Sequence, residues 1–204
     1  MGFLPINVLL VTVVLNSLLT IRSRREKLQK LNMVIGTFFS EIGNHLLVVL
    51  SDNDPKADDL RRALLIREDW DREQFSAICR IIEQREYEVN TENIDLVELH
   101  GYLMEKRDFM LRLLENPVLL EHQSFTELLS AVFHLNEELW RRDDFTCLPA
   151  SDCRHLEGDI VRVYRELVRE WIYYMQYLKD NYPYMFSLAL RTNPFDEEAS
   201  PVVA

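Results

Sequence analysis

The feature that most constrains this fold is an uncharged stretch of 20 residues at the amino terminus. It extends from Gly2 to Ile21 and reads GFLPINVLLVTVVLNSLLTI. A helix of roughly 20 apolar residues, rising about 1.5 Å per residue, spans a hydrocarbon core of about 30 Å. The basic sequence RSRREK follows at once, as it does in a stop-transfer segment. We therefore predict that residues 1–21 form a single transmembrane anchor.

A cleaved secretory signal peptide is the alternative interpretation of this stretch. Such a peptide has a basic region before a shorter apolar core, and small residues at its cleavage site. Here no lysine or arginine precedes the apolar residues, and the apolar stretch is long. The pattern favours an anchor that remains in the protein.

The orientation of the anchor is predicted by five basic residues that follow it, since none precedes it. Lys and Arg next to a transmembrane helix stay on the cytoplasmic side. The amino terminus should therefore face outward, and residues 22–204 should lie in the cytoplasm of a cell-membrane protein. Residues 22–30 would form a basic juxtamembrane segment that contacts the lipid bilayer. Its basic side chains are those of Arg22, Arg24, Arg25, Lys27 and Lys30.

Three polar residues within the predicted anchor recur every four positions, namely Thr12, Asn16 and Thr20. Residues at this spacing share one helix face, and an Asn in the membrane can donate a hydrogen bond to a neighbouring helix. One hypothesis is that this polar stripe lines a seam with a second membrane helix. The alternative is that the Thr hydroxyls bond their own backbone while Asn16 reaches toward the interface.

The rest of the chain has the pattern of an all-α protein. It contains few Gly and Pro and is rich in Leu, Glu and Arg, which favours helices. From Leu31 onward the apolar residues follow the i, i+3, i+4, i+7 spacing of amphipathic helices. We predict an antiparallel bundle of about five to six helices over residues 31–191, followed by an acidic mobile tail over 192–204. The predicted helices cover 31–50, 55–67, 71–88, 92–115, 124–140 and 151–182.

Charge is distributed unevenly along the chain. The net charge is −11, and residues 1–30 carry five basic residues against Glu26, so residues 31–204 hold −15. An acidic domain of this kind repels phosphate backbones, which argues against a nucleic-acid partner. Three irregularly spaced cysteines indicate ordinary reduced thiols, although Cys147 and Cys153 could bridge within CLPASDC.

Catalytic and metal-binding patterns are not evident in the sequence. It contains no nucleophile turn, no Gly-rich phosphate loop and no Glu-x-x-His pair of the di-iron bundle type. The nearest pairs are Glu41 with His45 and His134 with Glu137, which share helix faces and are expected by chance in an acidic helical protein. We therefore predict no catalytic residue, no metal and no cofactor.

A dense aromatic group lies at residues 171–186, WIYYMQYLKDNYPYMF. Tyrosine is favoured at interfaces that are apolar on one side and wet on the other. One interpretation is a surface for a protein partner, for further copies of the chain or for the membrane. The other is a wide core with Tyr hydroxyls at its rim. The candidate contact residues are Trp171, Tyr173, Tyr174, Tyr177, Tyr182 and Tyr184.

These observations favour a non-catalytic function. We expect a membrane-anchored cytoplasmic helical bundle that acts as a scaffold, an adaptor or a subunit of a membrane-associated assembly. A protein partner or a homo-oligomer is expected. The alternative is a ligand- or metal-binding sensor bundle tethered to the membrane, and a metal-dependent bundle oxidase ranks third.

Overall fold

The computed structural model describes the backbone of residues 3–120 and 122–203. Side chains within these ranges are described except at positions 3–8, 10, 24, 25, 118 and 120. Every regular element in this part of the chain is helical, so the predicted all-α class is confirmed. Met1 and Gly2, where the predicted anchor begins, lie outside the described residues.

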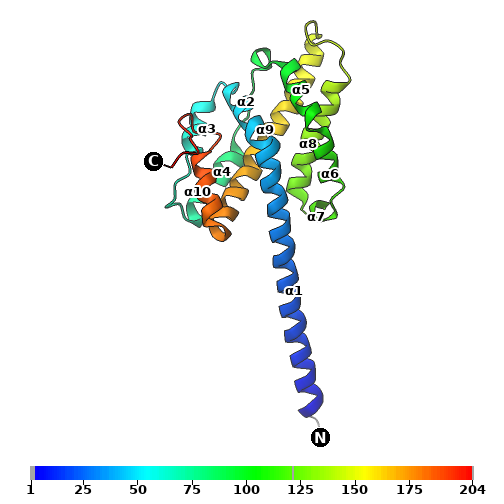
Figure 1. The fold of residues 1–204 in the computed structure, drawn as a ribbon, viewed down its shortest axis with the longest axis vertical. Helices are drawn as coiled ribbons and strands as arrows, with labels where there is room; N and C mark the ends of the chain where they lie inside the picture. Colours follow the sequence, from blue (N-terminus) through cyan, green and yellow to red (C-terminus); the bar gives the residue numbers. More distant parts are fainter. Residues whose placement is uncertain (1–2, 121, 204) are drawn as a thin grey trace.

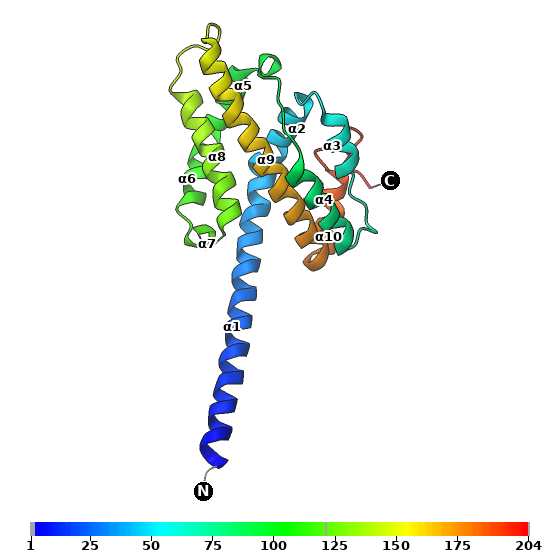
Figure 2. The same ribbon diagram turned by 180° about the vertical axis from the view of Figure 1, so that it is seen from behind.

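The first three elements form one continuous helix. Helix α1 (Phe3–Phe38) continues through a π-helical turn, η1 (Phe39–Gly43), into α2 (Asn44–Asp52). The amino-terminal part of α1 projects away from all other helices as an isolated stalk, whereas its last turns and α2 enter the helical body (Figures 1 and 2). Large apolar side chains on the stalk are at least 47% exposed, namely those of Leu9, Val11, Val13, Val14, Leu15, Leu18, Leu19, Ile21 and Leu28.

Length and composition single out this helix within the described part of the chain. The helical run Val11–Asp52 is the one that is long and apolar enough to cross a membrane by those two criteria. Of its most apolar 18-residue window, 44% is buried inside the protein. The run therefore joins an exposed apolar stalk to a helix that belongs to the core.

The body contains more helices than the five or six predicted. Lys106 separates α5 from α6 inside the predicted helix 92–115, and two short helices begin at Pro117 and Pro183, where we had predicted that helices end. Proline suits the first turn of a helix, because its missing N–H needs no partner there. The helices are α3 (Ala57–Leu64), α4 (Arg72–Gln84), α5 (Leu96–Glu105), α6 (Arg107–Leu114), α7 (Pro117–Leu120), α8 (Gln123–Trp140), α9 (Ala150–Asn181) and α10 (Pro183–Arg191).

Helix α9 is the centre of the body. It packs most extensively against α8, its neighbour across a short loop, and also against α4, α10, α2 and α1 (Figures 1 and 2). Phe38, Leu46 and Leu135 are fully buried with Ile160 and Tyr164 of α9. Burial of side chains of this size stabilises the fold by roughly 1.5–3 kcal/mol each.

Two helix starts in the body differ in how well the sequence predicts them. Helix α4 begins with a capping box in which Asp71 accepts from the backbone of Gln74 while the Gln74 side chain accepts from Asp71 N. The sequence S-F-T-E at Ser124–Glu127 has the pattern of a second capping box, which predicts a helix start at Ser124, but this box does not form. Helix α8 begins one residue earlier, and Nδ1 of His122 accepts from Phe125 N at 3.4 Å instead.

The first residues of the predicted tail pack against the helical body. Phe195 is 2% exposed and stacks edge-on against Trp171, with the ring centroids 5.0 Å apart. The buried Asn193 side chain donates to the carbonyl of Leu64 at 2.9 Å, which caps the end of α3. The folded body therefore extends past residue 191.

Candidate functional site

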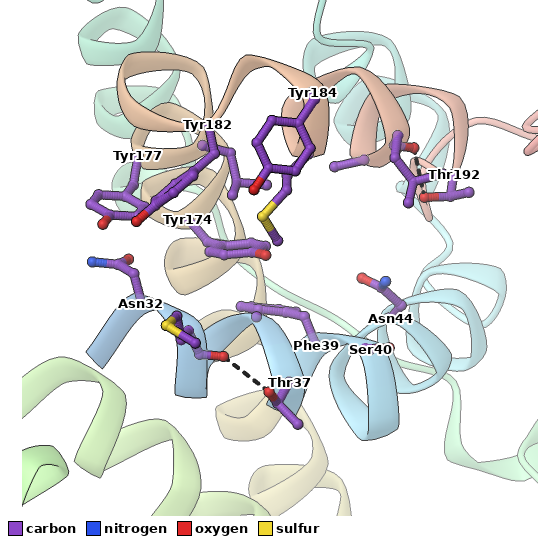
Figure 3. Close-up of a pocket in the computed structure, with 16 residues that line it drawn as sticks. Asn32, Thr37, Phe39, Ser40, Asn44, Tyr174, Tyr177, Tyr182, Tyr184 and Thr192 are labelled. Atoms are coloured by element: carbon purple, nitrogen blue, oxygen red, sulfur yellow. Dashed lines mark hydrogen bonds between the residues drawn. The ribbon is translucent and has the colours of Figure 1, made fainter. Parts of the chain in front are cut away.

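A groove of about 560 Å³ lies between the body end of α1 and the junction of α9 with α10 (Figure 3). One wall comes from the segment 32–44, and the other from residues between Tyr174 and Thr192. We call it the aromatic groove, because Tyr174, Tyr177, Tyr182 and Tyr184 all line it. None of the described residues that line it carries a charge.

Close packing between α1 and α9 forms the floor of the aromatic groove. The rings of Phe39 and Tyr174 stack with centroids 5.5 Å apart and an interplanar angle of 15°. Gly36 allows this approach, because a Cβ at that position would lie 2.5 Å from the Tyr174 hydroxyl oxygen. Burial raises the pKa of Tyr174 above its ordinary value, so the phenol stays neutral near pH 7.

Three further tyrosines form the outer wall of the groove (Figure 3). The ring centroids of Tyr177 and Tyr182 lie 5.9 Å apart, and those of Tyr182 and Tyr184 lie 6.3 Å apart in an edge-on arrangement. The Tyr184 side chain is 74% exposed, and the neighbouring Leu188 is 49% exposed. The structure thus brings four of the six predicted contact residues to one surface.

The other two predicted contact residues lie elsewhere. Trp171 is 2% exposed and packs on Phe195, so it belongs to the core and cannot contact a partner. Tyr173 is 40% exposed on α9 but does not line the aromatic groove. The interpretation as a wide core therefore holds for Trp171, which is covered by Phe195 of the predicted tail.

The predicted polar stripe lies on the exposed stalk. The Thr20 hydroxyl donates to the Asn16 carbonyl at 2.8 Å, and the hydroxyl of Ser17 donates to that of Val13 at 2.8 Å. These bonds satisfy both hydroxyls within their own helix, as in the alternative interpretation. Thr12 and the Asn16 side chain are exposed, and a role for Asn16 in helix association stays a prediction.

The predicted juxtamembrane basic residues follow on the same helix. Arg22 forms an ion pair with Glu26 at 3.0 Å, and its side chain is 79% exposed. Lys27 and Lys30 are exposed. The side chains of Arg24 and Arg25 lie outside the described residues.

Neither of the His–Glu pairs considered in the sequence forms a two-ligand unit. Glu41 pairs with Lys106 at 3.1 Å, and the His45 ring packs against Tyr102. Glu137 binds Arg107 at 2.8 Å and not His134. This bond to the guanidinium holds the pKa of Glu137 below its usual range.

A different group of ligand-type side chains lies between α8 and α9. Nε2 of His134 and Nε2 of His155 each lie 3.5 Å from Oδ2 of Asp159. Glu138 lies beside them, 3.8 Å from His134 and 3.6 Å from His155. We call these four residues the His–carboxylate cluster. This cluster was not predicted from the sequence, although two i, i+4 pairs, His134–Glu138 and His155–Asp159, flank a single loop and could have indicated it.

The cysteines are free thiols in the structure. Cys147 and Cys153 are both exposed and unbridged, and Cys79 is partly buried. Burial, with Glu83 nearby, raises the pKa of the Cys79 thiol above its ordinary value. This outcome agrees with the prediction of reduced thiols near the loop after α8.

Comparisons with known proteins give a family without an assigned activity. A family model described as the C-terminal helical domain of the uncharacterized protein MJ1433 matches residues 27–191. The uncharacterized protein MJ1433 of Methanocaldococcus jannaschii is 44% identical over 199 residues, which cover 98% of this chain and 80% of that protein. No solved structure matches the chain.

Proposed function

This chain belongs to the family of the MJ1433 C-terminal helical domain, and because that membership names no activity, we propose its function from the residues and their arrangement. We propose that it is a single-pass membrane protein whose cytoplasmic helical body is a non-catalytic scaffold. The body would assemble with a second copy of the chain through the aromatic groove.

The support for a membrane anchor is the exposed apolar surface of the stalk. Leaving a large apolar side chain in water instead of burying it costs roughly 1.5–3 kcal/mol. Nine such side chains lie on a projecting helix that no other described element covers. An extended apolar surface of this kind marks a membrane or protein contact, and the basic residues that follow it favour the membrane.

The continuous helix gives the anchor a mechanical role. Because α1, η1 and α2 form one helix, the body would be held at a fixed distance and orientation from the bilayer. The first buried core residue, Leu31, lies ten positions beyond Ile21, which is about 15 Å at the rise of an α-helix. The aromatic groove, on the segment 32–44, would then lie just above the headgroups on the same side in every copy.

The main observation in support of self-assembly is that an acidic body has an exposed surface without charge. Met33, Tyr184 and Leu188 at the rim of the groove are 69%, 74% and 49% exposed. Residues 31–204 hold a charge of −15, so two copies repel one another over most of their surfaces. The groove is uncharged, and parallel anchors would present it at the same height in two copies, which favours contact there.

The mass of the full-length protein in lipid nanodiscs tests this proposal. We expect a dimer or a larger assembly that Tyr184→Glu and Leu188→Glu each dissociate, because each places a charge on the uncharged rim. The matched control is Val97→Glu, since Val97 is 63% exposed on α5 and does not line the groove. A monomeric wild type would contradict self-assembly and leave another protein as the occupant of the groove. Assembly unchanged by both rim substitutions would show that the copies do not associate through the aromatic groove.

A further inference from the structure

The His–carboxylate cluster is built symmetrically from the two helices that pack most extensively in the body. Helix α8 contributes His134 and Glu138, and α9 contributes His155 and Asp159. Residues four apart lie on one face of a helix. Helices α8 and α9 lie side by side (Figure 2). The two pairs face each other across these helices, since His134 lies near Asp159 and His155 lies near Glu138.

Asp159 is the residue that distinguishes this cluster from an ordinary surface ion pair. Its side chain is 4% exposed, yet Oδ2 accepts no hydrogen bond from any described residue. A buried carboxylate oxygen without a partner is costly, and native proteins rarely leave one. Both imidazole Nε2 atoms lie 3.5 Å from this oxygen, which is too far for a good hydrogen bond.

We propose that His134, His155 and Asp159 bind a divalent transition-metal ion of the zinc class, with Glu138 as a fourth protein ligand or a neighbour that binds a metal-bound water. Two imidazole nitrogens with carboxylate oxygens form a ligand set that suits such ions. Ligand atoms around a tetrahedral ion with bonds of about 2.0 Å lie roughly 3.3 Å apart. The observed separations of 3.5 Å, with all three ligand atoms within 4.8 Å of one another, are close to this arrangement.

The surroundings hold the two carboxylates in place. Arg162 lies 3.3 Å from Oδ1 of Asp159, which leaves Oδ2 directed at the imidazoles. Arg142 binds Glu138 at 2.9 Å and Asp152 at 2.7 Å. Hydrogen-bonded partners of this kind orient ligands in metal sites. Three carboxylates outnumber the two guanidinium groups near the cluster, so the local charge still favours a cation.

The two imidazoles remain partly accessible. The His134 and His155 side chains are 46% and 53% exposed, so solvent can reach the proposed ion from one side. An ion there would cross-link α8 to α9 across the loop 141–149 and would satisfy the buried Oδ2 of Asp159. It would stabilise the body independently of the aromatic groove, which lies at the other end of α9.

Metal titration of the purified full-length protein tests the site. After chelator treatment we expect the wild type to bind about one equivalent of Zn²⁺, and to bind Co²⁺ with the visible absorption of a tetrahedral complex. Affinity should fall as the pH is lowered, because imidazole binds metal only when deprotonated. The thermal midpoint should rise when Zn²⁺ is added.

Substitutions separate a bound ion from simple His–Asp ion pairs. His155→Gln changes an exposed side chain and should fold, while weakening Zn²⁺ binding about tenfold or more. Asp159→Asn should do the same and abolish the Co²⁺ absorption. The control is His45→Gln, which alters a histidine that packs on Tyr102 and should leave binding unchanged. A wild type with no stoichiometric Zn²⁺, or binding that survives both cluster substitutions, would overturn the proposal.

Discussion

The Tyr174 hydroxyl oxygen lies 2.5 Å from the position that a Cβ would take on Gly36. We therefore expect Gly36→Ala to destabilise the protein, because the added methyl group forces the Tyr174 ring away from α1. Overpacking of this kind costs roughly 1–3 kcal/mol, whereas the change from Gly to Ala in a helix contributes about 1 kcal/mol of stability. The net loss, up to about 2 kcal/mol, can be measured by thermal unfolding of the full chain in detergent.

Two further variants identify the contact responsible. Tyr174→Phe should recover part of the loss in a Gly36→Ala background, since the remaining ring atoms lie 3.2 and 3.4 Å from the added methyl position. Gly101→Ala on α5 should instead stabilise the protein by roughly 0.5–1 kcal/mol, because nothing lies within 4 Å of its Cβ position. If Gly36→Ala and Gly101→Ala changed the stability equally, the contact with Tyr174 would have no influence on stability.

The stability of the body should depend on pH through Glu170 of α9. Its side chain is 1% exposed, and burial raises the pKa of this carboxyl above its ordinary value. Between the ordinary pKa of Glu and this raised value, the folded state holds a proton that the unfolded state has lost. Stability contributed by Glu170 is therefore present at low pH and is lost as the pH rises through that window.

Replacing Glu170 with Gln should remove this dependence. Relative to the wild type, Glu170→Gln should gain stability as the pH rises above about 4.5, with the two proteins most alike at lower pH. Thermal midpoints from pH 4 to 8 provide the comparison. Glu105→Gln is the control, because that side chain is 75% exposed. A constant offset between Glu170→Gln and the wild type at all pH values would refute a titrating Glu170.

The helical class could be predicted from sequence, but several helix limits could not. The apolar spacing after Leu31 is visible in the sequence, and it predicts helices. The break between α5 and α6 does not, because Lys106 is a good helix former whose ammonium binds Glu41, 65 positions away. His122 likewise caps α8 only because of its position after α7. Such limits depend on contacts that form once the helices pack.

The candidate sites, like the helix limits, could be predicted from the sequence only in part. Four tyrosines of the predicted contact surface do line one groove, because they lie close together in the sequence around the junction of α9 and α10. Trp171 does not, because Phe195 from the predicted tail covers it. His134 and Asp159 belong to different helices, and only the alignment of α8 against α9 decides that they face each other. The spacing within each helix was visible, but that alignment was not.

The two exposed cysteines can report the orientation of the body without any substitution. If residues 22–204 are cytoplasmic, a membrane-impermeant maleimide should label Cys147 and Cys153 only after cells are permeabilised. A Cys147→Ser, Cys153→Ser variant should lose most of the labelling, because Cys79 is partly buried. Labelling in intact cells would place the body outside, and would reopen the question of a bridge between Cys147 and Cys153.

Association through the stalk should depend on Asn16. The Thr20 hydroxyl already bonds the Asn16 carbonyl, which leaves the Asn16 amide as the group best suited to bind a neighbouring helix. Asn16→Leu should therefore weaken self-association by about 0.6–2 kcal/mol, measured by energy transfer between labelled copies at several protein-to-lipid ratios. Leu15→Ala is the matched control, since Leu15 is a 53% exposed apolar neighbour without a polar group. If Asn16→Leu associates as strongly as the wild type while Tyr184→Glu does not, assembly rests on the aromatic groove and the stalk serves only as an anchor.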